Sequence, residues 1–298
     1  MEKYLGFFAL IMVTVIWGGG FVASDMALET FTPFQIMFLR FLTASIIMGL
    51  PAQRAIRCIN KKNIIRSIPL GAALFGGFAL QIIGLQFTTP SKNAFLTATN
   101  VVMVPVIAMI FGRKKISAQG IAGAVIALAG AGVLSIQSGF VIGKGDVLSL
   151  LCAVCFAAQI YLTSLLVHKI DPSVLNFLQM LTAFILSFAG LSFTGGFSMH
   201  PSLKSALAVL YLGVVSTSIC YFLQTWAQKY VDETGAAIIL SMESVFGTVF
   251  SVIILHERIT PRMIAGSILI LCAVLISELG GKTSVKKADG MHENCENS

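Results

Sequence analysis

The stretch PFQIMFLRFLTA, residues 33–44, has a counterpart in PSVLNFLQMLTA, residues 172–183. Both begin with proline, carry a phenylalanine five residues later, at Phe38 and Phe177, and end in Thr-Ala. Other positions correspond at a spacing of 143 residues: Gln81 and Gln224, Asn100 and Glu243, and Ile121-Ala122-Gly123 and Ile264-Ala265-Gly266. Self-similarity at a fixed spacing indicates a duplicated unit, so the chain is interpreted as two copies of one fold.

The composition is that of a membrane protein. Of the 298 residues, 56% are hydrophobic and only 11% are charged, and the mean hydropathy is +0.89. Soluble globular domains carry about 25% charged residues, and here the deficit extends over most of the chain. The sequence therefore predicts an integral membrane protein, with the lipid bilayer as its surroundings.

The apolar segments are long enough to cross a bilayer as helices, which takes roughly 20 mainly apolar residues. The expected spans are 4–26, 33–50, 67–86, 92–112, 117–136, 146–168, 172–190, 203–228, 234–255 and 260–279. Unpaired backbone is costly in lipid, and the segments lack the alternation of barrel strands, so the fold class is all-α. The first segment has no clear cleavage site and is kept as a helix rather than a signal peptide.

The ten expected helices divide into two five-helix repeats, residues 4–137 and 144–280, followed by a polar tail, 281–298, expected to be disordered and cytoplasmic. Five crossings are an odd number, so the second repeat is predicted to be inverted relative to the first. With both termini cytoplasmic, most Lys and Arg residues fall on the inner side, as the positive-inside rule requires. The net charge of +7 is thus explained by topology and does not indicate a nucleic-acid partner.

Polar residues recur at helical spacing within the apolar segments. Asn93, Thr97 and Asn100 are four and three residues apart and share one face of a continuous helix. Each such residue could simply bond a neighbouring helix, but several stripes on corresponding helices favour a lined cavity. The candidate cavity residues are Trp17, Gln81, Asn93, Thr97, Asn100, Gln159, Tyr221, Gln224 and Glu243.

Glu243 is the most distinctive of these residues because it lies near the middle of the ninth expected helix. A carboxyl at that depth costs about 2.5–3.5 kcal/mol on insertion scales. Two interpretations stay open: a group that couples transport to protons or contacts a cationic moiety, and a structural hydrogen bond to another helix. Its counterpart, Asn100, cannot titrate, so any coupling role would belong to one repeat only.

Arg40 lies inside the second expected helix. Its long side chain is expected to extend toward the outer surface and to pair with Asp25 or Glu29 at the end of the first helix. The alternative is a contact with a substrate carboxylate. Cys152-x-x-Cys155 has metal or redox spacing, but no second pair or nearby histidine accompanies it, so no metal and no cofactor are predicted.

The chain resembles the ten-helix EamA-type permeases of the drug/metabolite transporter superfamily over residues 4–279. The resemblance rests on Trp17-Gly18-Gly19-Gly20-Phe21, Phe38-Leu39-Arg40-Phe41, Asn93-Ala94-Phe95-Leu96 before Pro105-Val106, Gly145-Asp146-Val147-Leu148, Met242-Glu243-Ser244-Val245-Phe246 and His256-Glu257-Arg258-Ile259-Thr260. It implies an inverted repeat, a central cavity, alternating access, and export of amino acids or other small metabolites. Where the family often has Leu-Glu-Pro-Val, this chain has Met242-Glu243-Ser244-Val245. Ser244 thus stands in place of the proline that usually bends the ninth helix.

The sequence thus predicts a secondary transporter, an exporter of small organic metabolites such as amino acids, in the inner or plasma membrane. Its expected partners are a small-molecule substrate and, as a coupling ion, protons. An importer or an uncoupled facilitator remains a rival interpretation, since direction is not encoded. A membrane-embedded enzyme is disfavoured because the four histidines fall in loops or the tail and Glu243 has no second deep carboxyl nearby. A receptor or structural protein is disfavoured because no domain lies outside the membrane.

Overall fold

The computed structural model describes residues 2–53, 59–112, 118–135, 143–194, 196–262, 264–269, 272–273 and 276. The expected tail, the basic loop at 113–115 and part of the tenth expected span lie outside these residues.

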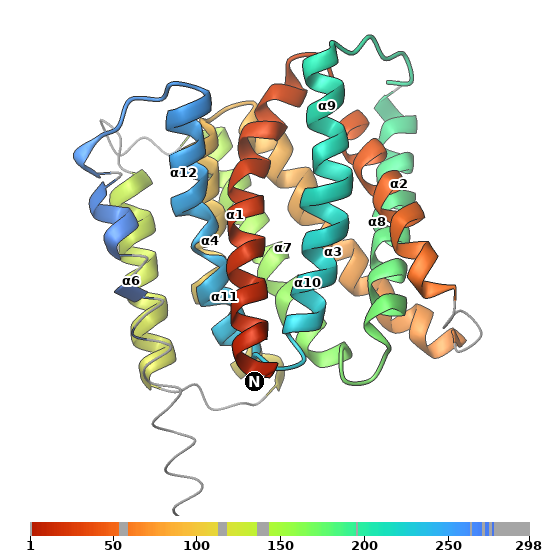
Figure 1. Ribbon diagram of the computed structural model, residues 1–298, viewed down its shortest axis with the longest axis horizontal. Coiled ribbons are helices and arrows are strands. Elements are labelled where there is room, and N and C mark those ends of the chain that lie inside the picture. Colours follow the sequence, from red (N-terminus) through yellow and green to blue (C-terminus); the bar gives the residue numbers. More distant parts are fainter. Residues whose placement is uncertain are drawn as a thin grey trace, which may run out of the picture.

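The chain is a bundle of helices (Figure 1). Their bounds are α1 Glu2–Leu28, α2 Pro33–Ala52, α3 Lys61–Leu85, α4 Pro90–Ala98, α5 Asn100–Gly112, α6 Ala118–Ser135, α7 Lys144–Leu166, α8 Pro172–Thr194, α9 Leu203–Tyr211, the π-helical segment η2 Leu212–Ile219, α10 Cys220–Ala227, α11 Glu233–Leu240 and α12 Glu243–Ile254. Eight continuous or nearly continuous helical segments are long and apolar enough to span a membrane. The all-α membrane fold is therefore confirmed. The fifth expected span is helical as α6, and the described part of the tenth is helical at 264–269.

The prolines that mark the two copies begin helices. Pro33 opens α2 directly after Thr32, whose hydroxyl accepts from the Gln35 backbone N–H while the Gln35 side chain accepts from the Thr32 N–H. Pro172 opens α8 after Asp171, whose carboxylate accepts from the Ser173 N–H at 2.9 Å. Proline suits the first helical position because its missing N–H would have no partner there, so the repeated motif is a helix start.

The fourth and ninth expected helices are each interrupted at corresponding positions. The first break falls at Thr99, between α4 and α5, and the second at Ser241–Met242, between α11 and α12. Both breaks are tightened by bonds between residues three apart: Val102 N–H to Thr99 O at 3.1 Å, and Val245 N–H to Met242 O at 3.0 Å. The second interruption thus forms without the proline that Ser244 replaces.

The two copies are interleaved rather than side by side. The most extensive helix contacts join α3 to α7, α2 to α8, and α1 to α12. Where α1 crosses α12, Gly18 lies against the backbone of Gly247 and against Phe246. Each of these contacts joins a helix of the first copy to one of the second, so the core belongs to both.

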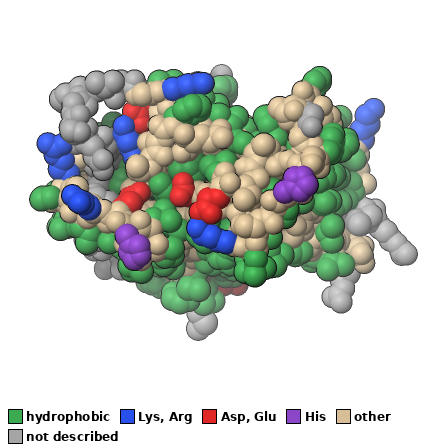
Figure 2. Space-filling model, turned by 90° about the horizontal axis from the view of Figure 1, so that it is seen from above, with side chains coloured by type: hydrophobic (Ala, Val, Ile, Leu, Met, Phe, Trp, Pro, Cys, Tyr) green, Lys and Arg blue, Asp and Glu red, His purple; other side chains and the backbone are tan. Residues whose placement is uncertain are grey.

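The sides of the bundle suit lipid, and its ends suit water. Large hydrophobic side chains such as Phe8, Ile110 and Phe193 are exposed, as expected for residues that meet acyl chains. Seen from above in Figure 2, acidic and basic side chains gather over one end, with hydrophobic side chains along much of the rim. An ion pair between Lys204 and Glu29, 2.5 Å apart, is exposed.

The crossing of α1 and α12 yields a prediction. A Cβ added at Gly18 would lie 2.6 Å from Phe246 Cβ and 2.7 Å from the Gly247 nitrogen. We expect Gly18→Ala to lower the unfolding temperature in detergent, because overpacking costs about 1–3 kcal/mol.

Gly132→Ala in α6 is the matched control, since no atom of the described chain lies within 4 Å of an added Cβ there. It should leave the unfolding temperature unchanged or raise it, because alanine is the better helix former by about 1 kcal/mol. Equal unfolding temperatures for the two variants would contradict the tight crossing.

Candidate functional site

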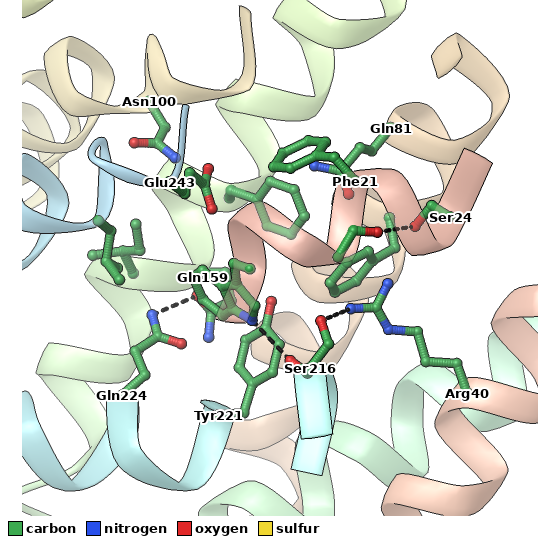
Figure 3. A pocket seen from close by; sticks show the side chains of 16 residues that line it. Phe21, Ser24, Arg40, Gln81, Asn100, Gln159, Ser216, Tyr221, Gln224 and Glu243 are labelled. Carbon is green, nitrogen blue, oxygen red and sulfur yellow. Dashed lines mark hydrogen bonds between the residues drawn. The ribbon is translucent and has the colours of Figure 1, made fainter. Parts of the chain in front are cut away.

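A cavity of about 500 Å³, its mouth included, lies among helices of both copies. The residues that line it are Trp17, Gly20, Phe21, Ser24, Arg40, Phe78, Gln81, Asn100, Phe156, Gln159, Ile160, Ser216, Tyr221, Gln224, Leu240 and Glu243 (Figure 3). They come from α1, α2, α3, α5, α7, η2, α10, α11 and α12.

Most of the residues expected from the sequence lie together on this wall: Trp17, Gln81, Asn100, Gln159, Tyr221, Gln224 and Glu243. Asn93 and Thr97 are corrections, because both are buried but neither is among the lining residues. The expected face assumed a continuous helix through Asn100. The tightened turn at Thr99 changes the rotation per residue, so Asn100 reaches the cavity while the α4 residues do not.

Asn93 and Thr97 instead lie outside the cavity and contact a residue of its wall, Gln81. The Asn93 amide donates to the Gln81 backbone oxygen and to Ser149 Oγ, both at 3.1 Å. The Thr97 hydroxyl accepts from the Gln81 side-chain amide at 3.4 Å. These bonds orient Gln81, and the one to Ser149 ties α4 to α7 of the other copy, so both residues are positioning residues.

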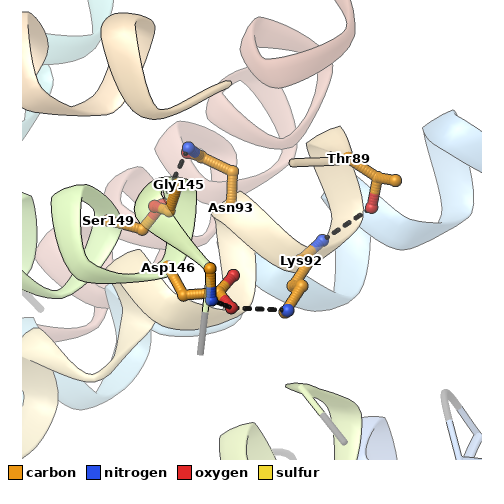
Figure 4. A network of polar contacts seen from close by, with 7 residues as sticks. Thr89, Lys92, Asn93, Gly145, Asp146 and Ser149 are labelled. Atoms are coloured by element: carbon orange, nitrogen blue, oxygen red, sulfur yellow. Dashed lines mark hydrogen bonds and ion pairs between the residues drawn. The ribbon is translucent and has the colours of Figure 1, made fainter. Parts of the chain in front are cut away.

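A second set of contacts fastens α4 to α7 near the end of the bundle (Figure 4). Lys92 Nζ lies 2.7 Å from Asp146 Oδ2, and the same carboxylate accepts from the Gly143 N–H at 2.9 Å. Close by in sequence, the Ser91 hydroxyl donates to Glu257. Glu257 therefore joins the loop after α12 to α4 and lies outside the cavity.

The amide side chains of the cavity form a chain of hydrogen bonds with acceptors left over. Gln224 donates to Gln159 Oε1 at 3.3 Å, and Gln159 donates to Thr163 Oγ1 at 3.1 Å. Asn100 Oδ1 and Gln224 Oε1 are buried and have no hydrogen-bond partner within the described residues. Buried polar atoms are nearly always paired, so these oxygens are available to a donor on a ligand.

Glu243 is the acidic residue among those that line the cavity. It is 5% exposed and begins α12, directly after the break in the ninth helix. Within the described chain it has no hydrogen bond and no ion pair, so the structural hydrogen bond considered from the sequence is not formed. Its carboxyl group faces the cavity, where it can meet a proton or a cationic group.

Arg40 lies differently from the expectation. Its side chain is 2% exposed and turns into the cavity rather than toward the surface. Nε donates to Thr217 Oγ1 at 2.5 Å, Nη2 donates to Ser216 Oγ at 3.2 Å, and the guanidinium carbon lies 3.7 Å from the centre of the Phe78 ring. No ion pair with Asp25 or Glu29 is formed among the described residues. Helix α2 packs on η2, and this contact directs Arg40 inward.

The partners of Arg40 were not predicted from the sequence because a π-helix supplies them. In η2 the hydroxyls of Thr217 and Ser218 donate to carbonyls five residues earlier, at 2.7 and 2.8 Å. This winding places Ser216 and Thr217 together beside the guanidinium. Single π-helical turns are frequent at functional sites, but a spacing rule based on 3.6 residues per turn does not find them.

Aromatic rings form the middle of the cavity wall. Phe78 meets Phe156 edge to face with ring centres 5.1 Å apart, and Trp17 lies 5.1 Å from Tyr221. Trp17 also donates from Nε1 to the Ser216 backbone oxygen at 2.8 Å. Phe21, Phe78 and Phe156 were not expected from the sequence, since the chain has 22 phenylalanines and their spacing does not single these out. The cavity thus combines apolar rings with one cation, one carboxyl and several amides.

Comparisons with known proteins agree with this architecture. The model of the EamA-like transporter family matches residues 4–136 and again 143–279. An uncharacterized transporter of Archaeoglobus fulgidus is 34% identical over 271 residues, covering 91% of this chain and 84% of its own. A probable amino-acid metabolite efflux pump of Salmonella typhimurium is 26% identical over 299 residues, covering 94% and 96%. The corresponding protein of Escherichia coli is 26% identical over 297 residues, with the same coverages.

A solved structure, titled only "Crystal structure of protein", has a TM-score of 0.75 at 17% identity and covers 93% of this chain and 96% of its own. That likeness concerns the fold. The family model matches nearly the whole chain, in both copies, and the relatives align over most of their length. The chain therefore belongs to the EamA-like transporter family.

Proposed function

We propose that this protein is a secondary transporter that exports small organic metabolites, amino acids among them, across the cytoplasmic membrane by alternating access. The observation that carries the proposal is the polar cavity between the two copies, lined by side chains of both. The similarity to proteins named probable amino-acid metabolite efflux pumps supports the substrate class and the direction. Transport, rather than catalysis, is also what the family indicates.

The proposed mechanism uses the duplication. An odd number of crossings in each copy would make the copies inverted, related by a pseudo-two-fold axis in the membrane plane. If the copies exchange conformations, a cavity that is open inward becomes open outward. The distribution of Lys and Arg supports cytoplasmic termini. The breaks at Thr99 and Met242 lie beside the cavity in corresponding places and are natural points for the two halves to bend.

Glu243 is the proposed coupling residue. It is the carboxyl of the cavity wall and has no partner within the described chain, so its proton is free to exchange when the cavity opens. Its counterpart Asn100 also lines the cavity but carries no titratable proton. A protonation step would therefore involve the second copy alone, and export of substrate would accompany entry of a proton.

The site assignment predicts the effect of replacing four cavity residues together. Proteoliposomes loaded with a mixture of isotopically labelled amino acids should release them through the wild-type protein. The combined variant Gln81→Ala, Asn100→Ala, Gln224→Ala and Glu243→Gln should lose at least about 90% of this flux, a change of about 1.4 kcal/mol or more.

The control is the double variant Gln53→Ala and Gln86→Ala, since both side chains are exposed at helix ends. It should transport as the wild type does. If the four-residue variant retained wild-type flux, the cavity would not be the route of the solute.

Coupling through Glu243 predicts a separate result. Glu243→Gln should abolish solute movement driven by a pH gradient, with a loss of about tenfold or more, while solute exchange without a gradient continues. The amide cannot carry the proton but keeps the shape and polarity of the carboxyl.

Glu243→Asp is the control, because it keeps a titratable group and should keep gradient-driven transport. Retention of gradient-driven transport in Glu243→Gln would remove the coupling role and favour an uncoupled facilitator. The measurement is the initial rate of labelled solute flux at several internal and external pH values.

A further inference from the structure

The Arg40 side chain is a buried cation that lacks an anion. A guanidinium has five N–H donors. Arg40 uses Nε on Thr217 and Nη2 on Ser216, and its other N–H groups have no partner in the part of the chain that the structure describes. The side chain as a whole is only 2% exposed, so its charge lies almost entirely within the protein.

The contacts that Arg40 does make are weak compensation for its charge. Two hydroxyls and the face of the Phe78 ring are neutral groups, and a cation kept from water at membrane depth is expensive unless a charge of opposite sign accompanies it. Intramembrane cations of this kind mark ligand or ion pathways. The missing component at this position is an anion.

From this geometry, and resting on the proposed transport function of the same cavity, we infer that Arg40 binds the carboxylate of the transported solute. The guanidinium fork matches a carboxylate with two parallel hydrogen bonds. Ser216 and Thr217, supplied by η2, hold the fork in place, and the free N–H groups face the space that Ser24 and Phe21 also line. Arg40 is thus the specificity-determining residue for acidic groups.

A single negative charge fits better than a double one. Arg40 is the one basic residue among those that line the cavity, and Glu243 lines the same cavity. One guanidinium neutralises one carboxylate, whereas a phosphate dianion would leave an uncompensated charge in a site that already holds a carboxyl. The rings of Phe78, Phe156 and Tyr221 beside the cation suit an apolar or aromatic body on the solute.

The carboxylate site and the coupling site are separate. No ion pair joins Arg40 to Glu243, and Figure 3 shows the two side chains apart from each other on the cavity wall. Substrate recognition by Arg40 and proton exchange at Glu243 are therefore assigned to different side chains of one cavity. Changes at Arg40 should alter which solutes are accepted and leave the dependence of transport on a pH gradient in place.

The test compares phenylalanine with its amide, which differs only in lacking the acidic group, and with phenyl phosphate, which places a phosphate on an aromatic ring. Phenylalanine, phenylalaninamide and phenyl phosphate compete with a mixture of labelled amino acids for transport into or out of wild-type proteoliposomes. We expect phenylalanine to compete at least about tenfold better than phenylalaninamide, because a site built for a polar group rejects the analogue that lacks it. Better competition by phenyl phosphate would overturn the assignment to a carboxylate.

Variants assign the preference to Arg40. Arg40→Gln should reduce the difference in competition between phenylalanine and phenylalaninamide to about twofold or less. Arg40→Lys keeps the charge but not the planar fork of donors, so its difference should lie between those of the wild type and Arg40→Gln. Lys92→Met is the control, since it removes a cation outside the cavity and should leave the preference unchanged. A preference that survives in Arg40→Gln overturns the inference.

Stability separates a substrate-binding role from a purely structural one. Arg40→Met, which fills similar space without a charge, should unfold at the same or a higher temperature than the wild type in detergent, because a buried unpaired cation is removed. A lower unfolding temperature together with an unchanged solute preference would mean that Arg40 only supports the fold, and would overturn the inference.

The outcomes also separate this inference from the proposed function. Transport of amino acids by the wild type with an unaltered preference in Arg40→Gln would leave the proposed function standing and reject the carboxylate site alone. If the wild type moved none of the labelled amino acids, the amino-acid exporter proposal and the inference that rests on it would both fall.

Discussion

The fold depends on one constraint: a backbone N–H or C=O that faces lipid must be paired within its own segment. Continuous helices satisfy it, so interruptions are tolerated only where protein or a cavity surrounds them. The chain has such interruptions at Thr99 and at Ser241–Met242. Each is followed directly by a residue that lines the cavity: Asn100 after the first and Glu243 after the second. The position of the cavity is therefore tied to the places where the helical ladder can be broken.

The two copies share a framework and differ in the chemistry of their side chains. The helix starts at Pro33 and Pro172 are retained, and the breaks in the two copies coincide. The charged positions are not retained. Arg40 corresponds to Gln179, which is buried in an amide network with Asn176 and Gln159. The cavity thus receives its cation from one copy and its carboxyl from the other, so a symmetric framework encloses an asymmetric site.

The features that depend on hydropathy could be predicted from the sequence. The directions of side chains that depend on a local change in helical winding could not. The apolar spans and several cavity residues, such as Gln81 and Gln224, followed from composition and spacing. Asn93 and Thr97 were misplaced because the helix that carries them stops at Thr99. Arg40 was expected to reach outward for Asp25, and instead the π-helical winding of η2 offers it hydroxyls inside. Such deviations depend on contacts between distant segments, which a spacing rule does not contain.

The indole of Trp17 gives the molecule a built-in optical reporter. The chain has two tryptophans. Trp17 lies on the cavity wall, bonded to the Ser216 backbone beside the hydroxyls that hold Arg40. Trp226 packs on Tyr230 and is not among the cavity residues. With Trp226 replaced by phenylalanine, the remaining emission would arise from the cavity alone, so its intensity and wavelength would follow filling and emptying of the cavity in real time, without a label.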